Sequence, residues 1–235
     1  MKESFQHDGI RLDLYRSQGS DTTVYILLPR GLGDETEQWA EEVSSDNGTC
    51  RPEAGSISIV LLRGMDWNND LTPWPAPGVF RKAKPFEGRA KAFLKALTDE
   101  QVPWFESQAG LACRRRVLVG ISLSGLFALW AGHMCGSFDT IAAISGSFWY
   151  DSLTEWVASH SIDPAVRKFY IALGDREKTS KDPRMCKVEA CTECIVSRLS
   201  EQTKVEYVLE KNVTHFSPIV PRLERLLLSL RTNRE

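Results

Sequence analysis

Two serines, Ser122 and Ser124, stand in the stretch VLVGISLSGLFALWAGH (residues 117–133), between an apolar run and a helix-like segment. A sharp strand-to-helix turn that exposes a nucleophilic serine usually has the pattern Gly-x-Ser-x-Gly. With Ser122 at the centre, Gly120 and Ser124 occupy the two positions that must be small, because the strand and helix backbones approach closely there. With Ser124 at the centre, one of these positions would hold Leu126. Ser122 is therefore the predicted nucleophile, although a corner of small residues also suits packing or phosphate binding.

A nucleophilic serine needs a base that removes its proton and an acid that orients the base. In one common arrangement the chain order is serine, acid, histidine, with the acid and the base on loops after later strands. Three of the four histidines do not fit this order, namely His7, His133 and His160. His215, in LEKNVTHFSPIVP, follows the last predicted strand and precedes the last predicted helix. His215 is therefore the predicted base, with a solvated surface histidine as the alternative.

The acid is expected after the strand KFYIALG, where the sequence continues as DREKTS. In many triads of this chain order the acid lies three residues beyond the glycine that ends the strand. Counted from Gly174, that position is Glu177. Asp175 is the competing candidate, since it is nearer the strand end, but aspartate there is also well suited to capping a turn. Glu177 is the first choice and Asp175 the second.

The reaction that such a triad performs passes through an oxyanion that backbone N–H groups stabilise. The N–H of Leu123 would lie at the N-terminus of the helix that follows Ser122, which makes it the first predicted donor. A second donor usually comes from a loop after an earlier strand. If TTVYILLPR is that strand, Gly31 and Leu32 in PRGLG are the candidates. The expected chemistry is attack of Ser122 on a carbonyl, followed by release of the acyl group to water.

The elements that must position these residues can be read from apolar runs of β-branched residues. Such runs occupy residues 11–16, 22–30, 56–64, 115–122, 140–147, 168–174 and 204–210. Helical periodicity is present at 34–45, at 86–105, after Ser122, and at 187–199. A last helix is expected near the C-terminus, with Ser217 as its N-cap and Pro218 as its first residue. Strands that alternate with helices predict an α/β fold with a mostly parallel sheet and helices on both faces. Without a repeat or a linker, residues 1–235 are expected to form one domain without a large lid.

Composition argues against several classes of partner and cofactor. The 29 lysines and arginines nearly balance the 31 aspartates and glutamates, so we expect neither nucleic acid nor a membrane surface as a partner. No apolar run has the length of a signal peptide or a membrane helix, which predicts a cytoplasmic protein. Cys186, Cys191 and Cys194 have a spacing known from iron–sulfur loops, but they lie in a helix-like segment and are expected to pack as small apolar residues. We expect no metal and no cofactor.

Several stretches of the sequence resemble one known family. GISLSGLFALWAG, SGSFWY, ALGDREKT and the histidine of VTHF are similar to the putative-esterase branch of the α/β-hydrolases, which includes esterase D and the enterobactin esterases. MDWNNDLTPWPAP resembles a group of mostly uncharacterised bacterial members. The resemblance implies the α/β-hydrolase fold, a serine hydrolase mechanism, and Ser122, Glu177 and His215 as the matching triad positions. The chain departs from the family at Ser124, which replaces a glycine, and lacks the usual His-Gly signature after the third strand.

Aromatic residues are the candidates for the substrate pocket. Trp67 and Trp74 lie in a proline-rich loop at 64–77, and Trp149 follows the sequence SGS. They would form an apolar rim for an acyl or aryl group, or they would only pin the loop to the domain. The leading prediction is an enzyme that hydrolyses a small-molecule carboxylic ester. The alternatives are a catalytically inactive binding module, and a serine acyltransferase or peptidase that uses the same site; the sequence leaves the natural ester and the oligomeric state open.

Overall fold

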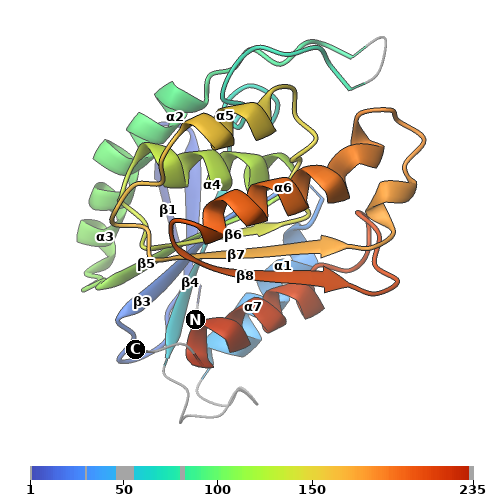
Figure 1. Cartoon of the computed structure of the whole chain (residues 1–235). Helices are drawn as coiled ribbons and strands as arrows, with labels where there is room; N and C mark the ends of the chain where they lie inside the picture. Colours follow the sequence, from blue (N-terminus) through green and yellow to red (C-terminus); the bar gives the residue numbers. More distant parts are fainter. Residues whose placement is uncertain (1, 30, 46–55, 80–82, 233–235) are drawn as a thin grey trace.

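An eight-stranded sheet forms the centre of the computed structural model, which describes residues 2–29, 31–45, 56–79 and 83–232. The strands follow the spatial order β1-β2-β4-β3-β5-β6-β7-β8 (Figure 1). β1 and β2 are antiparallel to their neighbours, and every pair from β4 to β8 is parallel. The strands are β1 (Lys2–His7), β2 (Ile10–Tyr15), β3 (Thr22–Leu27), β4 (Ile57–Arg63), β5 (Arg115–Ile121), β6 (Thr140–Ile144), β7 (Lys168–Gly174) and β8 (Lys204–Glu210).

Helices cover both faces of the sheet (Figure 1). One face carries α1 (Gly33–Ser44) and α7 (Val220–Thr232), and the other carries the longer series from α2 to α6. The members of that series, with the short helical turns of the described chain, are α2 (Ala90–Ala96), the π-helix η2 (Leu97–Gln101), α3 (Val102–Ala109), α4 (Leu123–Met134), α5 (Leu153–Ser159), η3 (Glu177–Thr179), η4 (Met185–Lys187) and α6 (Val188–Ser200). The predicted α/β architecture is confirmed.

The core consists of two apolar layers, one on each side of the sheet. Successive side chains of a strand point to opposite faces. In β3, Tyr25 and Leu27 therefore pack under the helices α2 to α6, whereas Val24 and Ile26 pack under α1 and α7. A strand with both faces covered must be apolar at nearly every position, which explains the continuous rather than alternating runs in the sequence.

The seven strands predicted from apolar runs correspond to β2 through β8, but β1 was missed. Its sequence KESFQH has a mixed pattern of half-buried and exposed positions, because β1 lies at the edge of the sheet. Arg30, at the end of one predicted strand, lies outside the described residues. An edge strand with one neighbour needs less apolar surface than a central one, so hydrophobic periodicity gives it a weak signal.

Two predicted helices differ from the observed ones. The helix predicted at 86–105 begins at Ala90 and extends to Ala109, with the π-turn η2 in its middle. Pro103 follows that turn, and a proline lacks the N–H of a regular helical bond, so the wider turn accommodates it. The last helix begins at Val220, so Ser217 and Pro218 are not its N-cap and first residue.

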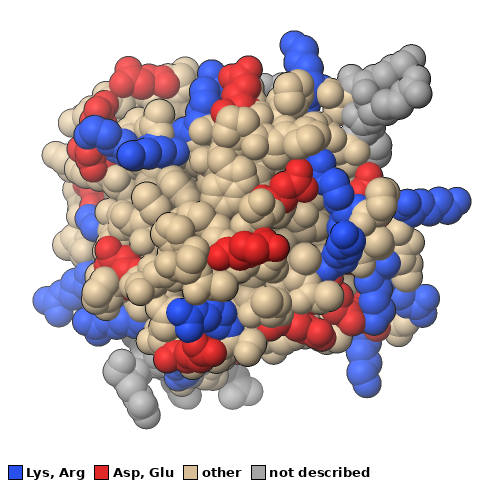
Figure 2. Space-filling model, turned by 45° about the horizontal axis from the view of Figure 1, so that its top comes forward, with Lys and Arg blue, Asp and Glu red and all other residues tan. Residues whose placement is uncertain are grey.

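The surface matches the balanced composition. Side chains of both charges are spread around a wide uncharged area on the face shown in Figure 2. Among the described residues, none of the helices combines the length and the apolar character that crossing a bilayer requires. The segment with Cys191 and Cys194 is helical as predicted, and its buried face carries Val188, Ile195 and Leu199.

Candidate active site

Ser122 occupies the junction between β5 and α4 in a backbone conformation that few non-glycine residues adopt. Its φ of 61° and ψ of −120° place it in the left-handed half of conformational space. Such a conformation costs on the order of 1–3 kcal/mol and persists only where the surroundings enforce it. Here the Ser122 N–H donates to the carbonyl of Ile144 at 3.1 Å, and its own carbonyl accepts from Gly125, Leu126 and Ser147.

The close approach of strand and helix that the motif predicts is present. A Cβ atom added to Gly120 would lie 1.9 Å from the carbonyl oxygen of Ser124, a distance that no side chain can occupy. A Cβ atom on Gly125 would lie 2.9 Å from the Cα atom of Gly146, so the far side of the turn is also tight. The requirement for small residues around Ser122 is therefore confirmed at these positions.

Ser124 contributes more than a small side chain. It is fully buried, and its Oγ accepts the N–H of Ile121 at 2.7 Å. The same hydroxyl has the carbonyl oxygens of Leu27 and Ile121 as acceptors, each at 2.9 Å. The serine that replaces the usual glycine thus joins the turn to the neighbouring strand β3. A sequence motif shows the size of this residue but not its hydrogen bonds.

The structure brings Ser122, His215 and Glu177 together in one line of hydrogen-bonding atoms. The His215 Nε2 atom lies 3.1 Å from Ser122 Oγ, and the His215 Nδ1 atom lies 2.9 Å from Glu177 Oε2. A carboxylate accepts a proton-bearing Nδ1, which leaves Nε2 of a neutral imidazole as an acceptor for the serine hydroxyl. This is the arrangement in which an imidazole can remove the proton of the serine.

The loop between β8 and α7 holds His215. The Thr214 N–H donates to Ser217 Oγ at 2.9 Å, and the Ser217 N–H donates to the Thr214 carbonyl at 3.1 Å. These two bonds close a tight turn around the histidine. Ser217, which the sequence suggested as a helix cap, therefore shapes the His215 loop instead.

Glu177 lies in η3 and is only 7% exposed. Its Oε1 atom accepts from the Ser145 hydroxyl at 2.5 Å and from the Gly174 N–H at 2.9 Å, while Oε2 faces His215. Burial by itself would raise the pKa of this carboxyl, but the bonds from His215, Ser145 and Gly174 outweigh burial and hold the pKa below its ordinary value. Glu177 is therefore held as a carboxylate at neutral pH.

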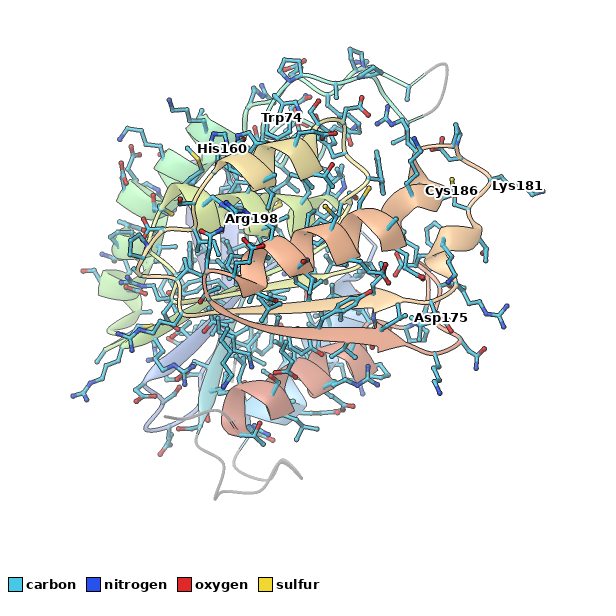
Figure 3. The ribbon with its side chains drawn as sticks, in the orientation of Figure 1. Trp74, His160, Asp175, Lys181, Cys186 and Arg198 are labelled. Carbon is cyan, nitrogen blue, oxygen red and sulfur yellow. The ribbon has the colours of Figure 1, made fainter. Side chains whose placement is uncertain are left out.

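Asp175, the second choice for the acid, lies in the turn after β7 (Figure 3). Its N–H donates to the carbonyl of Glu210 at 3.0 Å, which extends the pairing of β7 with β8. Within the described part of the chain, Asp175 has no hydrogen bond to His215, and its Oδ1 atom is buried without a partner. The geometry thus favours Glu177 over Asp175 as the partner of the histidine.

A cavity of about 820 Å³ opens above Ser122 and His215. Trp67 lines it together with Met65 and Phe216, so one predicted pocket tryptophan has the expected position. The other two, Trp74 and Trp149, are not among its lining residues.

Trp74 and Trp149 make other contacts. Trp74 Nε1 donates to the Asp151 carbonyl at 2.9 Å, and its ring packs against Tyr150 and Trp156 near α5 (Figure 3). The guanidinium of Arg184 lies over the ring of Trp149, 5.1 Å from the ring centre. For Trp74 the contacts fit the alternative that it fastens the loop.

The three predicted oxyanion donors differ in their positions and in the hydrogen bonds of their N–H groups. Leu123 is the first residue of α4, so its N–H has no acceptor within the helix and faces the end where Ser122 stands. Leu32 lines the cavity, but its N–H already donates to the Pro29 carbonyl at 3.4 Å. Gly31 has a φ of 92° and lines an adjoining hollow of about 330 Å³.

Sequence reasoning missed three residues of this region: Ser145, Phe216 and Arg222. Ser145 lies at the end of β6 within the quoted SGSFWY, where only the family resemblance drew attention to it. Phe216 is 93% exposed although it is large and apolar, and it directly follows His215. Arg222, in α7, is buried and lines the cavity, yet nothing in a single sequence distinguishes it from a surface arginine.

Comparison with known proteins gives a family match over most of the chain. Residues 14–214 match the family described as "Putative esterase". A curated relative, the uncharacterized protein YbbA of Bacillus subtilis (strain 168), is 30% identical over 128 residues, covering 52% of this chain and 51% of YbbA. The chain thus spans about half the length of the curated relative that it matches.

Solved structures of low sequence identity share the fold. The siderophore hydrolase EstA from Aspergillus nidulans superposes with a TM-score of 0.74 at 20% identity, covering 100% of this chain and 94% of EstA. An IroE-like serine hydrolase from Shewanella oneidensis gives 0.78 at 18% identity, covering 99% and 80%. An S-formylglutathione hydrolase from Agrobacterium tumefaciens gives 0.60 at 12% identity, covering 99% and 94%.

These likenesses, together with the eight-stranded, mostly parallel sheet, confirm the α/β-hydrolase fold that the sequence resemblance implies. The family match extends from β2 to the loop that carries His215. The chain therefore belongs to the putative-esterase family, and it has the α/β-hydrolase fold.

Proposed function

We propose that this chain hydrolyses a small-molecule carboxylic ester through an acyl intermediate on Ser122. The observation that carries the proposal is the line of contacts from Ser122 Oγ to His215 Nε2 at 3.1 Å and from His215 Nδ1 to Glu177 Oε2 at 2.9 Å. These contacts meet at a serine whose backbone is held in a strained turn at the mouth of a cavity. Nucleophile, base and acid are then Ser122, His215 and Glu177.

In the first half of the reaction, His215 Nε2 takes the proton of Ser122 while Oγ forms a bond to the carbonyl carbon of the ester. The carbonyl oxygen becomes an oxyanion, for which the Leu123 N–H is a donor at the start of α4. The intermediate then collapses, the bond to the alcohol oxygen breaks, and the alcohol leaves with the proton from the imidazolium. The product on the enzyme is an acyl ester of Ser122.

In the second half, water replaces the alcohol. His215 accepts a proton from the water while the water oxygen attacks the acyl carbon. The imidazolium then gives that proton to Ser122 Oγ as the bond between Oγ and the acyl carbon breaks and the carboxylic acid is released. Glu177 remains a carboxylate throughout, where it fixes the imidazole orientation and stabilises its charged form. Its depressed pKa supports this role, because a protonated carboxyl would lose the charge that attracts the imidazolium.

The cavity favours an ester with an apolar or aromatic group. Met65, Trp67, Phe216 and Ile219 contribute apolar lining beside Ser122. The exposed ring of Phe216 stands edge-on to His215, with ring centres 5.3 Å apart, and offers a flat surface that water solvates poorly. Solved structures of the same fold include a protein described as a siderophore hydrolase, which supports hydrolysis as the reaction of this chain.

A fluorophosphonate probe tests the proposal, because it reacts covalently with an activated serine. We expect the folded protein to form one adduct, located on Ser122 by peptide mass spectrometry, and Ser122→Ala to form none. Heat-denatured protein is the matched control, since it contains the same serines without the His215 contact. Absence of an adduct on Ser122 in folded protein would overturn the enzyme proposal and favour a binding module on the same fold.

Turnover is measured with p-nitrophenyl esters of increasing acyl length. The wild type should hydrolyse them at least about 10³-fold faster than Ser122→Ala, since removal of the nucleophile abolishes the acyl intermediate. Equal rates for both proteins would show background hydrolysis. Addition of a primary alcohol or amine as a competing acceptor reveals acyl transfer, and a peptide substrate in place of the ester reveals peptidase activity.

A further inference from the structure

A buried arginine and a buried serine stand behind Glu177, on the side away from His215. The Ser145 hydroxyl donates to Glu177 Oε1 at 2.5 Å, and Arg222 Nη1 donates to Ser145 Oγ at 2.6 Å. Ser145 and Arg222 are 1% and 3% exposed, so bulk water does not replace these bonds. The two residues therefore extend the line of contacts at Ser122 by two further groups.

The chemistry of the guanidinium fixes the direction of these bonds. A guanidinium carries only donors, so the contact between Arg222 Nη1 and Ser145 Oγ can be made only with Ser145 as the acceptor. The single proton of the Ser145 hydroxyl is then left for Glu177 Oε1. With the Gly174 N–H on the same oxygen at 2.9 Å, Oε1 has two donors, and Oε2 remains for His215. Arg222 thus selects which carboxylate oxygen faces the histidine.

Ser145 is held for this task in an unusual conformation. Its φ is 50°, although it is not a glycine, and its N–H donates to the Ala172 carbonyl of β7 at 2.8 Å. Left-handed backbone at a buried non-glycine residue persists only where the surroundings enforce it, and such residues cluster at functional sites. The conformation turns the hydroxyl from the end of β6 toward Glu177.

Arg222 also places a positive charge beside the carboxylate. Its Nη2 atom lies 3.9 Å from Glu177 Oε1, and within the described chain this buried nitrogen has no hydrogen-bond acceptor. Its Nε atom donates to Glu210, which is buried and also accepts from Arg225. The two carboxylates and the two guanidiniums carry equal and opposite formal charge, so the set is neutral before His215 is protonated.

The charged and titratable groups that face Glu177 come from every element packed around it. His215 approaches from the loop after β8, and Arg222 approaches from α7. Glu210 on β8 binds Arg222 and Arg225 of α7, and Asp175 and Arg176 lie beside Glu177 in the turn after β7. Of these, Arg222 is the cation that is both buried and within 4 Å of the carboxylate of Glu177.

We propose that Arg222 and Ser145 are positioning residues for the reaction: they hold Glu177 with Oε2 toward His215, so that the imidazole keeps Nε2 within reach of Ser122. This inference rests on the proposed function. Without the Arg222 donor, the Ser145 hydroxyl is free to rotate away from Oε1, and the carboxylate loses a restraint that keeps Oε2 on Nδ1 of His215. The proton of Ser122 is then transferred less efficiently to the imidazole.

The rate of fluorophosphonate labelling of Ser122, measured between pH 5 and pH 9, tests the inference without knowledge of the natural ester. Arg222→Met removes the charge, and Arg222→Lys keeps it but loses the fork that reaches both Ser145 and Glu210. Arg225→Met is the matched control, because it removes a cation from the same Glu210, three positions further along α7, without contact to Ser145. Circular dichroism checks that each protein is folded.

In Arg222→Met and in Arg222→Lys we expect the labelling rate at the plateau of the pH profile to fall by about tenfold, because neither side chain has the fork that reaches both Ser145 and Glu210. Arg225→Met should match the wild type. Ser145→Ala should lower the plateau rate by about tenfold, and with an ester substrate it should lower kcat more than it changes KM.

Arg222→Met leaves Glu210 with one partner and can fail to fold, so Arg222→Lys, which keeps the charge, serves as the second variant. A plateau rate unchanged from the wild type in the folded variant overturns the inference, as does an equal loss in Arg225→Met. Wild-type labelling of Ser145→Ala overturns the role of the hydroxyl. If the wild type itself does not label, the proposed function fails instead, so the two failures are distinct.

Discussion

At Glu177, burial and hydrogen bonding act on one carboxyl in opposite directions. Burial in a site of low polarity favours the neutral acid, whereas three donors, one of them the imidazole of His215, favour the anion. The donors prevail, so the pKa lies below its ordinary value and the carboxylate persists through the neutral range. Asp175, two residues earlier, has neither the burial nor the imidazole contact of Glu177, although its type alone would serve the chemistry equally well.

Replacement of either carboxylate by its amide separates the two candidates. We expect Glu177→Gln to lower kcat/KM for p-nitrophenyl esters on the order of 10³-fold, because the amide cannot stabilise the imidazolium. Asp175→Asn should stay within about twofold of the wild type, since its side chain does not touch His215. A larger loss in Asp175→Asn than in Glu177→Gln would reassign the acid.

At the scale of elements, the turn between β5 and α4 is the most constrained connection around the site. Gly120 lies under the backbone of Ser124, and Ser124 Oγ bonds to β3 and β5, so the helix is fixed to two strands before its first turn is complete. The strained φ of Ser122 follows from these restraints. The strain is tolerated because several hydrogen bonds would be lost if the turn relaxed.

This packing predicts the effect of a single methyl group. Gly120→Ala should lower the free energy of unfolding by at least about 3 kcal/mol, because the new Cβ would meet a backbone oxygen that has no room to move. Gly33→Ala is the control, since a Cβ there has its nearest neighbour, Arg63 Nη2, at 3.9 Å. Urea unfolding followed by circular dichroism measures both, and a stable Gly120→Ala protein would contradict the assigned geometry.

At the scale of the molecule, parallel strands bring distant residues to one edge. Ser122 follows β5, Ser145 follows β6, Glu177 follows β7 and His215 follows β8, so the four side chains converge at the carboxyl ends of four adjacent strands. The contacts run from Ser122 to His215, Glu177 and Ser145, an order that differs from that of the strands, because the loops after the strands bring the side chains together. The same two-sided core that buries these strands also buries polar groups far from the site.

His133 is one such group, and it links the stability of the whole molecule to pH. The histidine lies in α4, where its Nδ1 donates to the Ser161 carbonyl at 3.1 Å and its buried Nε2 has no partner among the described residues. Burial lowers its pKa below 6.5, although the bond to Ser161 acts the other way. The unfolded chain therefore takes up this proton more readily than the folded one, and stability that is present above pH 6.5 is lost as the pH falls.

His133→Gln should reduce this loss. We expect the urea midpoint of the wild type to fall between pH 7.5 and pH 5.5, and the midpoint of His133→Gln to fall less, because glutamine cannot take up the proton. His160→Gln is the comparison, since His160 is an exposed neighbour that stacks on Trp156 at 4.2 Å (Figure 3). Equal losses in the wild type and in His133→Gln would assign the pH dependence to other groups.

Local sequence features determined which residues could form the turn and the strands. Gly120, Ser122 and Ser124 are adjacent in the chain, so their small size and order are visible without a fold, and fully buried strands require long apolar runs. β1 escaped this reasoning because an edge strand needs little apolar surface, and the π-turn before Pro103 escaped it because helical periodicity does not reveal one wider turn within a predicted helix. The positions of His215 and Glu177 followed from chain order and from the family resemblance.

Only the tertiary structure decided which side chains meet. The partnership of Ser145, Arg222 and Glu210 spans residues 145–222 and depends on the distance between the end of β6 and α7, which no local pattern encodes. The same holds for the contact of His215 with Glu177, which the sequence only ranked above Asp175, and for Trp67 lining the cavity while Trp74 anchors a loop. Residue type and spacing define which chemistry is available, whereas contact depends on long-range packing, which is the sum of many weak interactions over the whole chain.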